Sequence, residues 1–179
     1  LERMDIYCLG DVVGYGPDPG ACVDLIRQLE ASTVLGNHDA AAVGEISDRW
    51  FNHMARQSAS WTRDHLNDDQ IEYLRSRPRR IETDWFLGVH GSPNEPLREY
   101  ITDAYSARDA VDGTSFRNLF VGHTHKPALF KENDEFEKEM IGGDGWRPLD
   151  VSRGRQVVNP GSVGQPRDGI PDASYLIVD

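Results

Sequence analysis

The sequence predicts a mixed α/β or α+β fold in which helices cover two packed β-sheets. The early part of the chain alternates short apolar runs with segments of helical periodicity, and the later part consists mostly of strand-like runs. Alternation followed by consecutive strands is typical of such layered folds. The length of 179 residues fits one domain, and we find no repeat, linker or boundary, so residues 1–179 are assigned to a single domain.

The predicted elements of the first half are two short strands and three helices. Their apolar spacing and capping residues indicate strands at Asp5–Leu9 and Ser32–Leu35, a helix at Asp18–Glu30, a long helix at Asp48–Leu66, and a helix capped by Asn67 that ends before Pro78. In the long helix, one face is expected to carry Trp50, Phe51, Met54, Ser58, Trp61 and His65. The tryptophans are interpreted as core residues.

The second half is predicted to be mainly strands, with one helix at Ala104–Val111. The strand candidates are Arg80–Thr83, Trp85–His90, Leu119–Gly122, Pro127–Lys131, Gln156–Val158 and Ser174–Val178. The acidic segment Lys131–Trp146 ends in a Gly-rich run, and we interpret it as a solvated hairpin on the surface.

Composition excludes several classes of protein. The formal net charge of −11 argues against nonspecific binding of nucleic acid, which depends on Lys and Arg. No apolar run is long enough to span a bilayer and no signal peptide is visible, so we expect a cytoplasmic protein without a membrane partner. Cys8 and Cys22 are too few for a disulfide framework and are expected to be reduced.

Four strand-like runs end in residue types that bind metals. The motifs are Gly10-Asp11, Gly36-Asn37-His38-Asp39, His90-Gly91 and Gly122-His123-Thr124-His125. Each has an ordinary alternative: Asp11 as a turn residue, Asn37 or Asp39 as a helix cap, His90 as a strand-end histidine. On an extended backbone, His123 and His125 would project to the same side and face one metal. Together the motifs predict a metal site at the ends of the strands.

The order of these motifs resembles the calcineurin-like metallophosphoesterases. The segments Tyr7–Pro17, Val34–Ala41 and Val158–Gly169 are similar to the small bacterial branch of predicted phosphoesterases in that family. The resemblance implies a four-layer αββα sandwich that holds two divalent metal ions, Mn, Fe or Zn, at its mouth.

The resemblance also implies a role for each motif residue. Asp11 would bridge the two ions, and Asn37, His90 and His123 would complete one metal site, whereas His125 would belong to the other. His38 would stand beside the leaving group, held by Asp39. An imidazole titrates near neutral pH, so His38 is suited to protonate a leaving oxygen, and Asp39 would favour the protonated form.

One part of the family pattern is absent. The Asp-x-His motif of the first strand is missing. The opening strand and helix are therefore absent, and so are two ligands of the metal site that contains His125. A sequence cut short, a misplaced start or a real deletion would each explain the gap. If the missing strand belongs inside a sheet, its neighbours present unpaired edges, and we expect the chain to associate, for example as a homo-oligomer.

Two functions follow from these observations. The first is a metal-dependent phosphoesterase that hydrolyses a phosphodiester, a small nucleotide or a related phosphate ester with a metal-activated water. The alternative is a non-catalytic or impaired family member that acts as a protein-interaction scaffold. Arg153, Arg155 and Arg167 could meet a substrate phosphate, although we favour plain solvation for each of them.

Overall fold

The computed structural model describes residues 4–133, 135–139, 141–143, 145–146 and 148–178 and shows a layered α/β arrangement. The helices are α1 (Pro19–Gln28), α2 (Asn37–Ala42), the 3-10 turn η1 (Asp48–Trp50), α3 (His53–Asp64), α4 (Asp68–Arg75) and α5 (Ala104–Asp112). The strands are β1 (Tyr7–Cys8), β2 (Ser32–Thr33), β3 (Arg80–Glu82), β4 (Phe86–Val89), β5 (Asn118–Val121), β6 (Ala128–Glu132), β7 (Phe136–Glu139) and β8 (Gln156–Asn159). Within these ranges, no helix has both the length and the apolar character that a membrane span requires.

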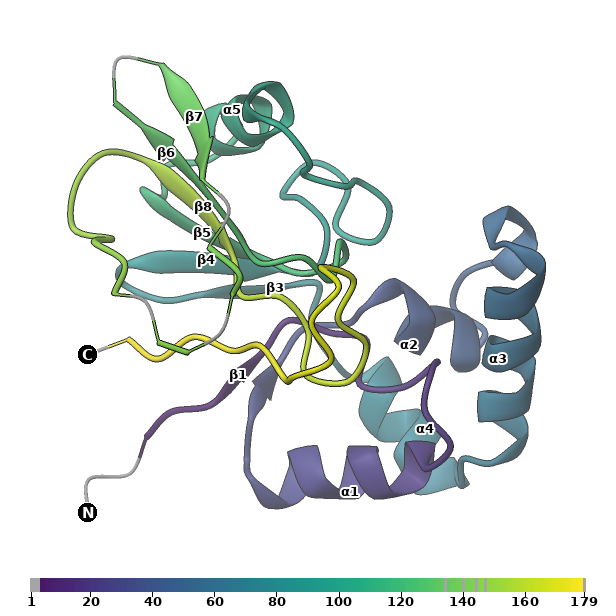
Figure 1. The fold of residues 1–179 in the computed structure, drawn as a ribbon. Coiled ribbons are helices and arrows are strands. Elements are labelled where there is room, and N and C mark those ends of the chain that lie inside the picture. Colours follow the sequence, from purple (N-terminus) through teal and green to yellow (C-terminus); the bar gives the residue numbers. More distant parts are fainter. Residues whose placement is uncertain (1–3, 134, 140, 144, 147, 179) are drawn as a thin grey trace.

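The strands form two sheets that lie between helical layers. A six-stranded sheet has the order β3-β4-β5-β8-β6-β7, and β1 and β2 form a separate parallel pair. Helix α5 packs on the large sheet near β7 and β8, whereas α1 to α4 gather on the far side of β1 and β2 (Figure 1). Helices therefore enclose the sheets from both sides, which confirms the predicted fold class.

Alternation of side chains along the strands produces a core on each face of the large sheet. On one face, Leu87 and Val89 of β4 pack with Ala107 and Val111 of α5 in the main hydrophobic cluster. On the other face, Phe86 packs with residues that include Phe120, Leu129, Val158 and Leu9. Successive residues of a strand point to opposite faces, so one four-residue strand contributes to both clusters.

Parallel pairing brings the ends of several strands to one edge. Strands β4, β5 and β8 run parallel, with Val89 opposite Val121 and Phe120 opposite Val158. The residues that follow β4 and β5 therefore leave the sheet side by side. The amide of Gly122 donates to the carbonyl of His90 over 2.8 Å, which ties these two loops together. This edge is the one at which the sequence predicts ligands.

The prediction of one long helix at Asp48–Leu66 is wrong. Phe51 has extended backbone angles, and Asn52 caps a new helix by accepting a hydrogen bond from the amide of Ala55 at 2.9 Å. Burial of the Phe51 ring against His38, with ring centroids 4.7 Å apart, holds the chain away from helical geometry. The interpretation of the tryptophans as core residues is also wrong, because each of them is at least 39% exposed.

Two further predictions concern the end of the chain. The acidic hairpin is confirmed in part: β6 and β7 pair antiparallel with Glu132 opposite Phe136, but the hairpin begins at Ala128, and Phe136 is buried. The strand predicted at Ser174–Val178 is wrong: Ser174 is held by Ser162 and Pro160, and no strand of the described residues pairs with this segment. A strand requires such a partner to satisfy its backbone groups.

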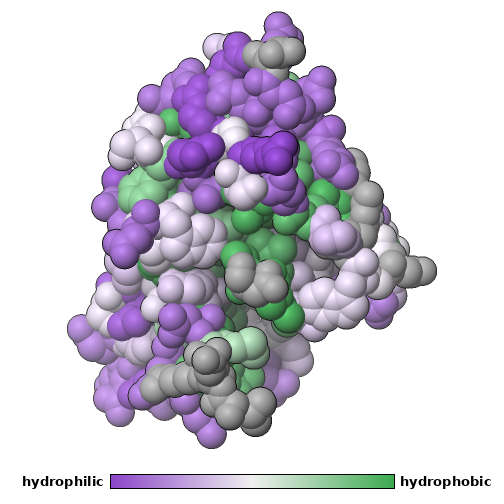
Figure 2. All heavy atoms as spheres, turned by 90° about the vertical axis from the view of Figure 1, so that its left-hand side faces the viewer, coloured by the Kyte–Doolittle hydropathy of each residue, from purple (hydrophilic) through white to green (hydrophobic). Residues whose placement is uncertain are grey.

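One side of the molecule exposes apolar side chains. Figure 2 shows an apolar strip between polar margins on the face that lies to the left in Figure 1. Large exposed apolar residues near the ends of the described chain are Met4, Ile6, Tyr7, Tyr175, Ile177 and Val178. Within the described residues β1 pairs only with β2, so its second edge is open. Association through this face stays a prediction.

Candidate metal centre

Two Gly-containing loops meet at the base of the site. Gly10-Asp11 follows β1, and Gly36 follows β2 as the N-cap of α2. A Cβ atom on Gly36 would lie 2.2 Å from both the amide nitrogen and the Oδ1 atom of Asp11, so only glycine allows this approach. The Asp11 carboxylate is therefore pressed against the start of α2, where its Oδ1 accepts a hydrogen bond from the amide of His38 at 2.9 Å.

The orientation of His90 is fixed by a backbone carbonyl. Its Nδ1 atom lies 2.7 Å from the carbonyl oxygen of Leu9. A carbonyl can only accept, so Nδ1 carries the proton and Nε2 of the neutral ring presents a bare lone pair. Such a contact to the second ring nitrogen is the usual support of a metal-binding histidine.

Four potential ligand atoms converge around this lone pair. The Nε2 atom of His90 lies 2.9 Å from Oδ1 of Asn37, 3.1 Å from Nδ1 of His123 and 3.4 Å from Oδ2 of Asp11. Ligand atoms of Asp11, His90 and His123 all lie within 4.8 Å of one another. The structure thus brings together Asp11, Asn37, His90 and His123, as the sequence predicts.

This group fits a divalent cation better than it fits a hydrogen-bond network. Two of its atoms are oxygens that only accept, and Nε2 of His90 has no proton to offer them. Oδ2 of Asp11 is buried without any hydrogen-bond partner in the described structure. Buried acceptors that face one another repel unless positive charge lies between them, and mixed N/O donors suit Mn, Fe or Zn.

Burial also sets the protonation states of these ligands. It raises the pKa of Asp11 to about 7 and lowers the pKa of His90. The pKa of His123 falls to about 3, again chiefly through burial and also through the nearby His90. Near neutral pH both imidazoles are therefore uncharged, which is the form that binds metals.

His125 lies apart from this tight group. Its Nδ1 atom lies 2.7 Å from the carbonyl oxygen of Gln165, so its Nε2 atom is also left with a lone pair. Its ring packs edge-on against Tyr15 at 5.3 Å. The extended backbone expected for this motif is wrong, because His123 and His125 have φ angles of 63° and 58°.

Left-handed backbone marks three of the predicted ligands. In addition to the two histidines, Asp11 has a φ angle of 54°. Such angles are unfavourable for residues other than glycine, and they persist at functional sites where surrounding contacts enforce them. The strain is consistent with side chains that the loops hold in a required direction.

The contact predicted between Asp39 and the ring of His38 is wrong. Asp39 is fully buried, and its carboxylate accepts from the amides of Val13 and Gly36, both at 3.0 Å. It therefore caps α2 and fixes the loop after Asp11, which matches the helix-cap alternative. Burial lowers the pKa of His38 to about 3, and Asp39 forms no hydrogen bond with its ring.

Tyr15 takes the place that Asp39 was expected to fill. Its hydroxyl oxygen lies 2.6 Å from Nε2 of His38, and the two rings pack with centroids 4.1 Å apart. Sequence reasoning missed this residue, as it missed Tyr100, which stacks on His123 at 3.7 Å. It also missed Asn159, whose side chain donates to the carbonyl of Gly122 at 2.6 Å. Only the position of Asn159 after a predicted strand gave any signal.

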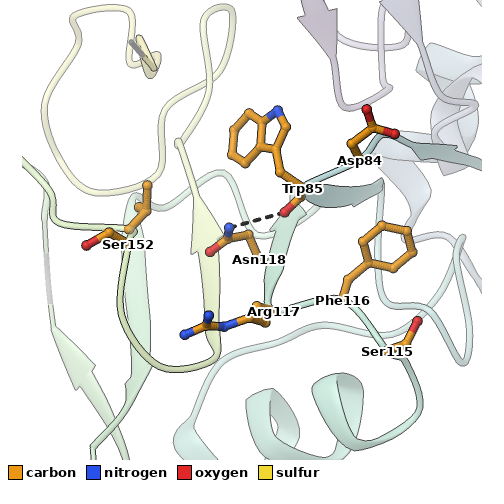
Figure 3. Close-up of a pocket in the computed structure, with 8 residues that line it drawn as sticks. Asp84, Trp85, Ser115, Phe116, Arg117, Asn118 and Ser152 are labelled. Carbon is orange, nitrogen blue, oxygen red and sulfur yellow. Dashed lines mark hydrogen bonds between the residues drawn. The ribbon is translucent and has the colours of Figure 1, made fainter.

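A separate hollow lies at the opposite end of β4 and β5. It has a volume of about 490 Å³ and is lined by Asp84, Trp85, Ser115, Phe116, Arg117, Asn118, Val151 and Ser152 (Figure 3). Asn118 donates there to the carbonyl of Trp85 at 3.2 Å. The lining holds one carboxylate and no histidine. The chemistry therefore points to the ligand cluster, and not to this hollow, as the site.

The chain is similar in sequence and fold to several known proteins. The chain is 36% identical to an uncharacterised protein from Methanocaldococcus jannaschii, over 97% of its own length and 70% of that protein. It is similar to a crystal structure of a metallophosphoesterase from Sphaerobacter thermophilus, with a TM-score of 0.83 and 43% identity over 94% of this chain and 70% of that one. A hypothetical protein from Pyrococcus horikoshii shares the fold, with a TM-score of 0.65 and 20% identity over 88% of this chain and 63% of that one.

A protein-family model matches almost the whole sequence. Residues 2–179 match the calcineurin-like phosphoesterase superfamily domain. The match includes every motif that contributes to the ligand cluster. The chain belongs to the calcineurin-like phosphoesterase superfamily.

Proposed function

We propose that the protein is a metal-dependent phosphoesterase that hydrolyses a phosphodiester or small nucleotide ester at the Asp11–His123 cluster, with two divalent cations as cofactors. Membership of the phosphoesterase superfamily supports the class of reaction. The observation that carries the proposal is the convergence of Asp11 Oδ2, Asn37 Oδ1 and His123 Nδ1 on Nε2 of His90.

The residues of the site have different roles in the proposed reaction. Divalent cations held there would supply Lewis acidity and would lower the pKa of a water bound to them. His90 and His123 offer uncharged nitrogen ligands, and Asp11 offers the negative charge that a cation requires. His38, one residue beyond Asn37, lies beside this group with its Nε2 atom on Tyr15. Because burial lowers the pKa of His38 to about 3, its ring would be neutral near neutral pH and would act on the leaving oxygen as a hydrogen-bond donor.

The test is hydrolysis of bis-p-nitrophenyl phosphate by the purified chain with added Mn²⁺. We expect His123→Ala to lower kcat/KM by at least about 100-fold, in line with the loss of a metal ligand. His53→Ala is the matched control, because His53 is exposed at the start of α3 and forms no part of the cluster. Equal activity of wild type and His123→Ala would refute the proposal.

The scaffold function is a second candidate because only Asp11 and His125 are assigned to the second cation. Metal analysis of the purified chain separates the two. Two equivalents of metal support the enzyme and one equivalent supports an impaired form. A chain that binds no metal, in spite of the buried Oδ2 of Asp11, would support the scaffold.

A further inference from the structure

A cationic side chain lies next to the histidines of the site without a carboxylate partner. Arg167 is exposed, and its guanidinium donates to the Tyr15 hydroxyl at 3.1 Å and to Oε1 of Gln165 at 2.9 Å. Both partners are neutral. Across the described ranges of the chain, no acidic group lies within ion-pair distance of Arg167, and its Nη1 atom makes no hydrogen bond. An arginine held by neutral acceptors keeps its charge available for an anion.

The backbone connects this arginine to a predicted ligand. The amide of Arg167 donates to the carbonyl of His125 at 3.1 Å, and Nδ1 of His125 donates to the carbonyl of Gln165 at 2.7 Å. The segment from Gln165 to Arg167 thus wraps around the His125 ring. Any movement of this loop would move the guanidinium and the imidazole together.

The other connection runs through Tyr15 to His38. The Tyr15 ring lies under the guanidinium, 5.6 Å from it, and its hydroxyl is shared with Nε2 of His38. Gly14 makes this packing possible, because a Cβ atom there would lie 2.5 Å from the Cβ of His38. Arg167, Tyr15 and His38 therefore form a continuous chain of contacts at the edge of the site.

The charge of Arg167 acts on the whole site. Burial is the main cause of the shifted pKa values there, and in addition the positive charge of Arg167 lowers the pKa of Asp11, Tyr15 and His38. It also lowers the pKa of His125. A protein with a formal net charge of −11 requires such local positive charge to hold an anionic ester.

We infer that Arg167 is the residue that binds a non-bridging oxygen of the substrate phosphate, and that Tyr15 positions His38 relative to that anion. This inference rests on the proposed function and names a binding residue for it. The guanidinium offers the free Nη1 donor, and a fork of donors matches the geometry of a phosphate. The sequence favoured plain solvation for Arg167, and this inference gives it a specific role in its place.

Inorganic phosphate is the probe for this assignment. Its Kd is measured by calorimetry on the Mn²⁺-loaded full chain, and its inhibition of ester hydrolysis is measured in parallel. We expect Arg167→Ala to weaken phosphate by about 10- to 100-fold, the usual range for a charged hydrogen-bonded pair. Arg167→Lys, which keeps the charge and loses the fork, should fall between wild type and Arg167→Ala. Arg153→Ala removes an exposed arginine before β8, at the far end of that strand, and should leave the Kd unchanged.

Tyr15→Phe separates positioning from binding. Gln165 still holds Arg167 in this variant, so the Kd for phosphate should change by less than about threefold while kcat falls by about tenfold or more. A purely structural effect would shift the melting temperature, and would lower kcat and phosphate affinity together. That outcome would overturn the positioning role.

The outcomes for Arg167 distinguish the anchor from the proposed function. If the wild type hydrolyses esters and Arg167→Ala binds phosphate as well as Arg153→Ala does, the anchor is wrong and the phosphoesterase stands. If the wild type has no activity and its phosphate binding still depends on Arg167, the anchor stands and the reaction is wrong. Wild type that does not bind phosphate at all would overturn the anchor.

Discussion

The Nε2 atom of His90 lies 3.1 Å from the Nδ1 atom of His123, and both nitrogens face the carboxylate of Asp11. Residues 33 positions apart reach this distance because β4 and β5 pair in parallel and end together. The Leu9 carbonyl holds the proton of His90 on the other side of its ring. His90 therefore presents a bare lone pair toward a buried carboxylate and a second imidazole. This arrangement suits a cation, and the following predictions derive from it.

The affinity for metal should fall at acidic pH because of Asp11. Burial raises the pKa of its carboxyl to about 7, so below pH 7 a cation must displace a proton, whereas His123, with a pKa of about 3, is already neutral. We expect the Kd for Mn²⁺ to rise by about tenfold per pH unit below pH 7. Calorimetry at pH 6 in buffers of different ionisation enthalpy should show release of about one proton. Release of none, with an unchanged Kd, would contradict the assignment.

Asp11→Asn should weaken metal binding and raise the stability of the metal-free fold. A folded-state pKa of about 7, above the ordinary value of 3.8 for an aspartate, means that the ionised carboxyl is unfavourable in the metal-free fold above pH 7. The amide keeps the acceptor for the His38 amide and removes the charge. At pH 8 the metal-free variant should be about 1–3 kcal/mol more stable than wild type, since one pKa unit corresponds to about 1.4 kcal/mol. Urea unfolding with and without Mn²⁺ measures this, and added metal should stabilise only the wild type.

Asp39→Ala should act through stability. The substitution leaves the buried amides of Val13 and Gly36 without acceptors, which is expected to cost about 2–4 kcal/mol. Asp103→Ala is the matched control, because Asp103 caps the exposed start of α5 and should cost about 1 kcal/mol. Chemical unfolding compares the two variants. An Asp39→Ala protein that is as stable as wild type but inactive would restore the catalytic role predicted from the sequence.

Gly36→Ala should separate the two loops of the site. The new Cβ would lie 2.2 Å from Asp11, against backbone that cannot move without displacing the carboxylate. We expect a loss of at least 2 kcal/mol of stability, of the order seen for overpacked sites, and weakened metal binding. Gly16→Ala, in the loop after β1 that carries Asp11, meets nothing within 4 Å and should change neither quantity. Circular dichroism melts and Mn²⁺ titration of both variants check the comparison.

The sequence predicted which metal-binding residue types lie at the strand ends better than it predicted the contacts that their side chains make. Asp11, Asn37, His90 and His123 were found because each ends an apolar run, and parallel pairing carries such positions to a common edge. The partner of His38 was not found. Tyr15 reaches it by a reversal of the chain at Gly14, which has a φ angle of 113°, and no local periodicity reports such a reversal.

The errors in the fold have the same origin. The sequence from Asp48 to Leu66 has helical spacing, but Phe51 leaves the helix to pack on His38, a residue 13 positions earlier. Ser174–Val178 has the composition of a strand, but the described residues provide no strand beside it. In both cases a distant contact, or the lack of one, decides the local conformation against the propensity.

The most direct test of the metal centre is anomalous diffraction from crystals of the chain soaked with Mn²⁺. We expect a peak about 2.0–2.3 Å from Nε2 of His90, Nδ1 of His123, a carboxylate oxygen of Asp11 and Oδ1 of Asn37, which are typical lengths for nitrogen and oxygen ligands. Anomalous density found only elsewhere, with these four side chains still hydrogen-bonded to one another, would contradict it.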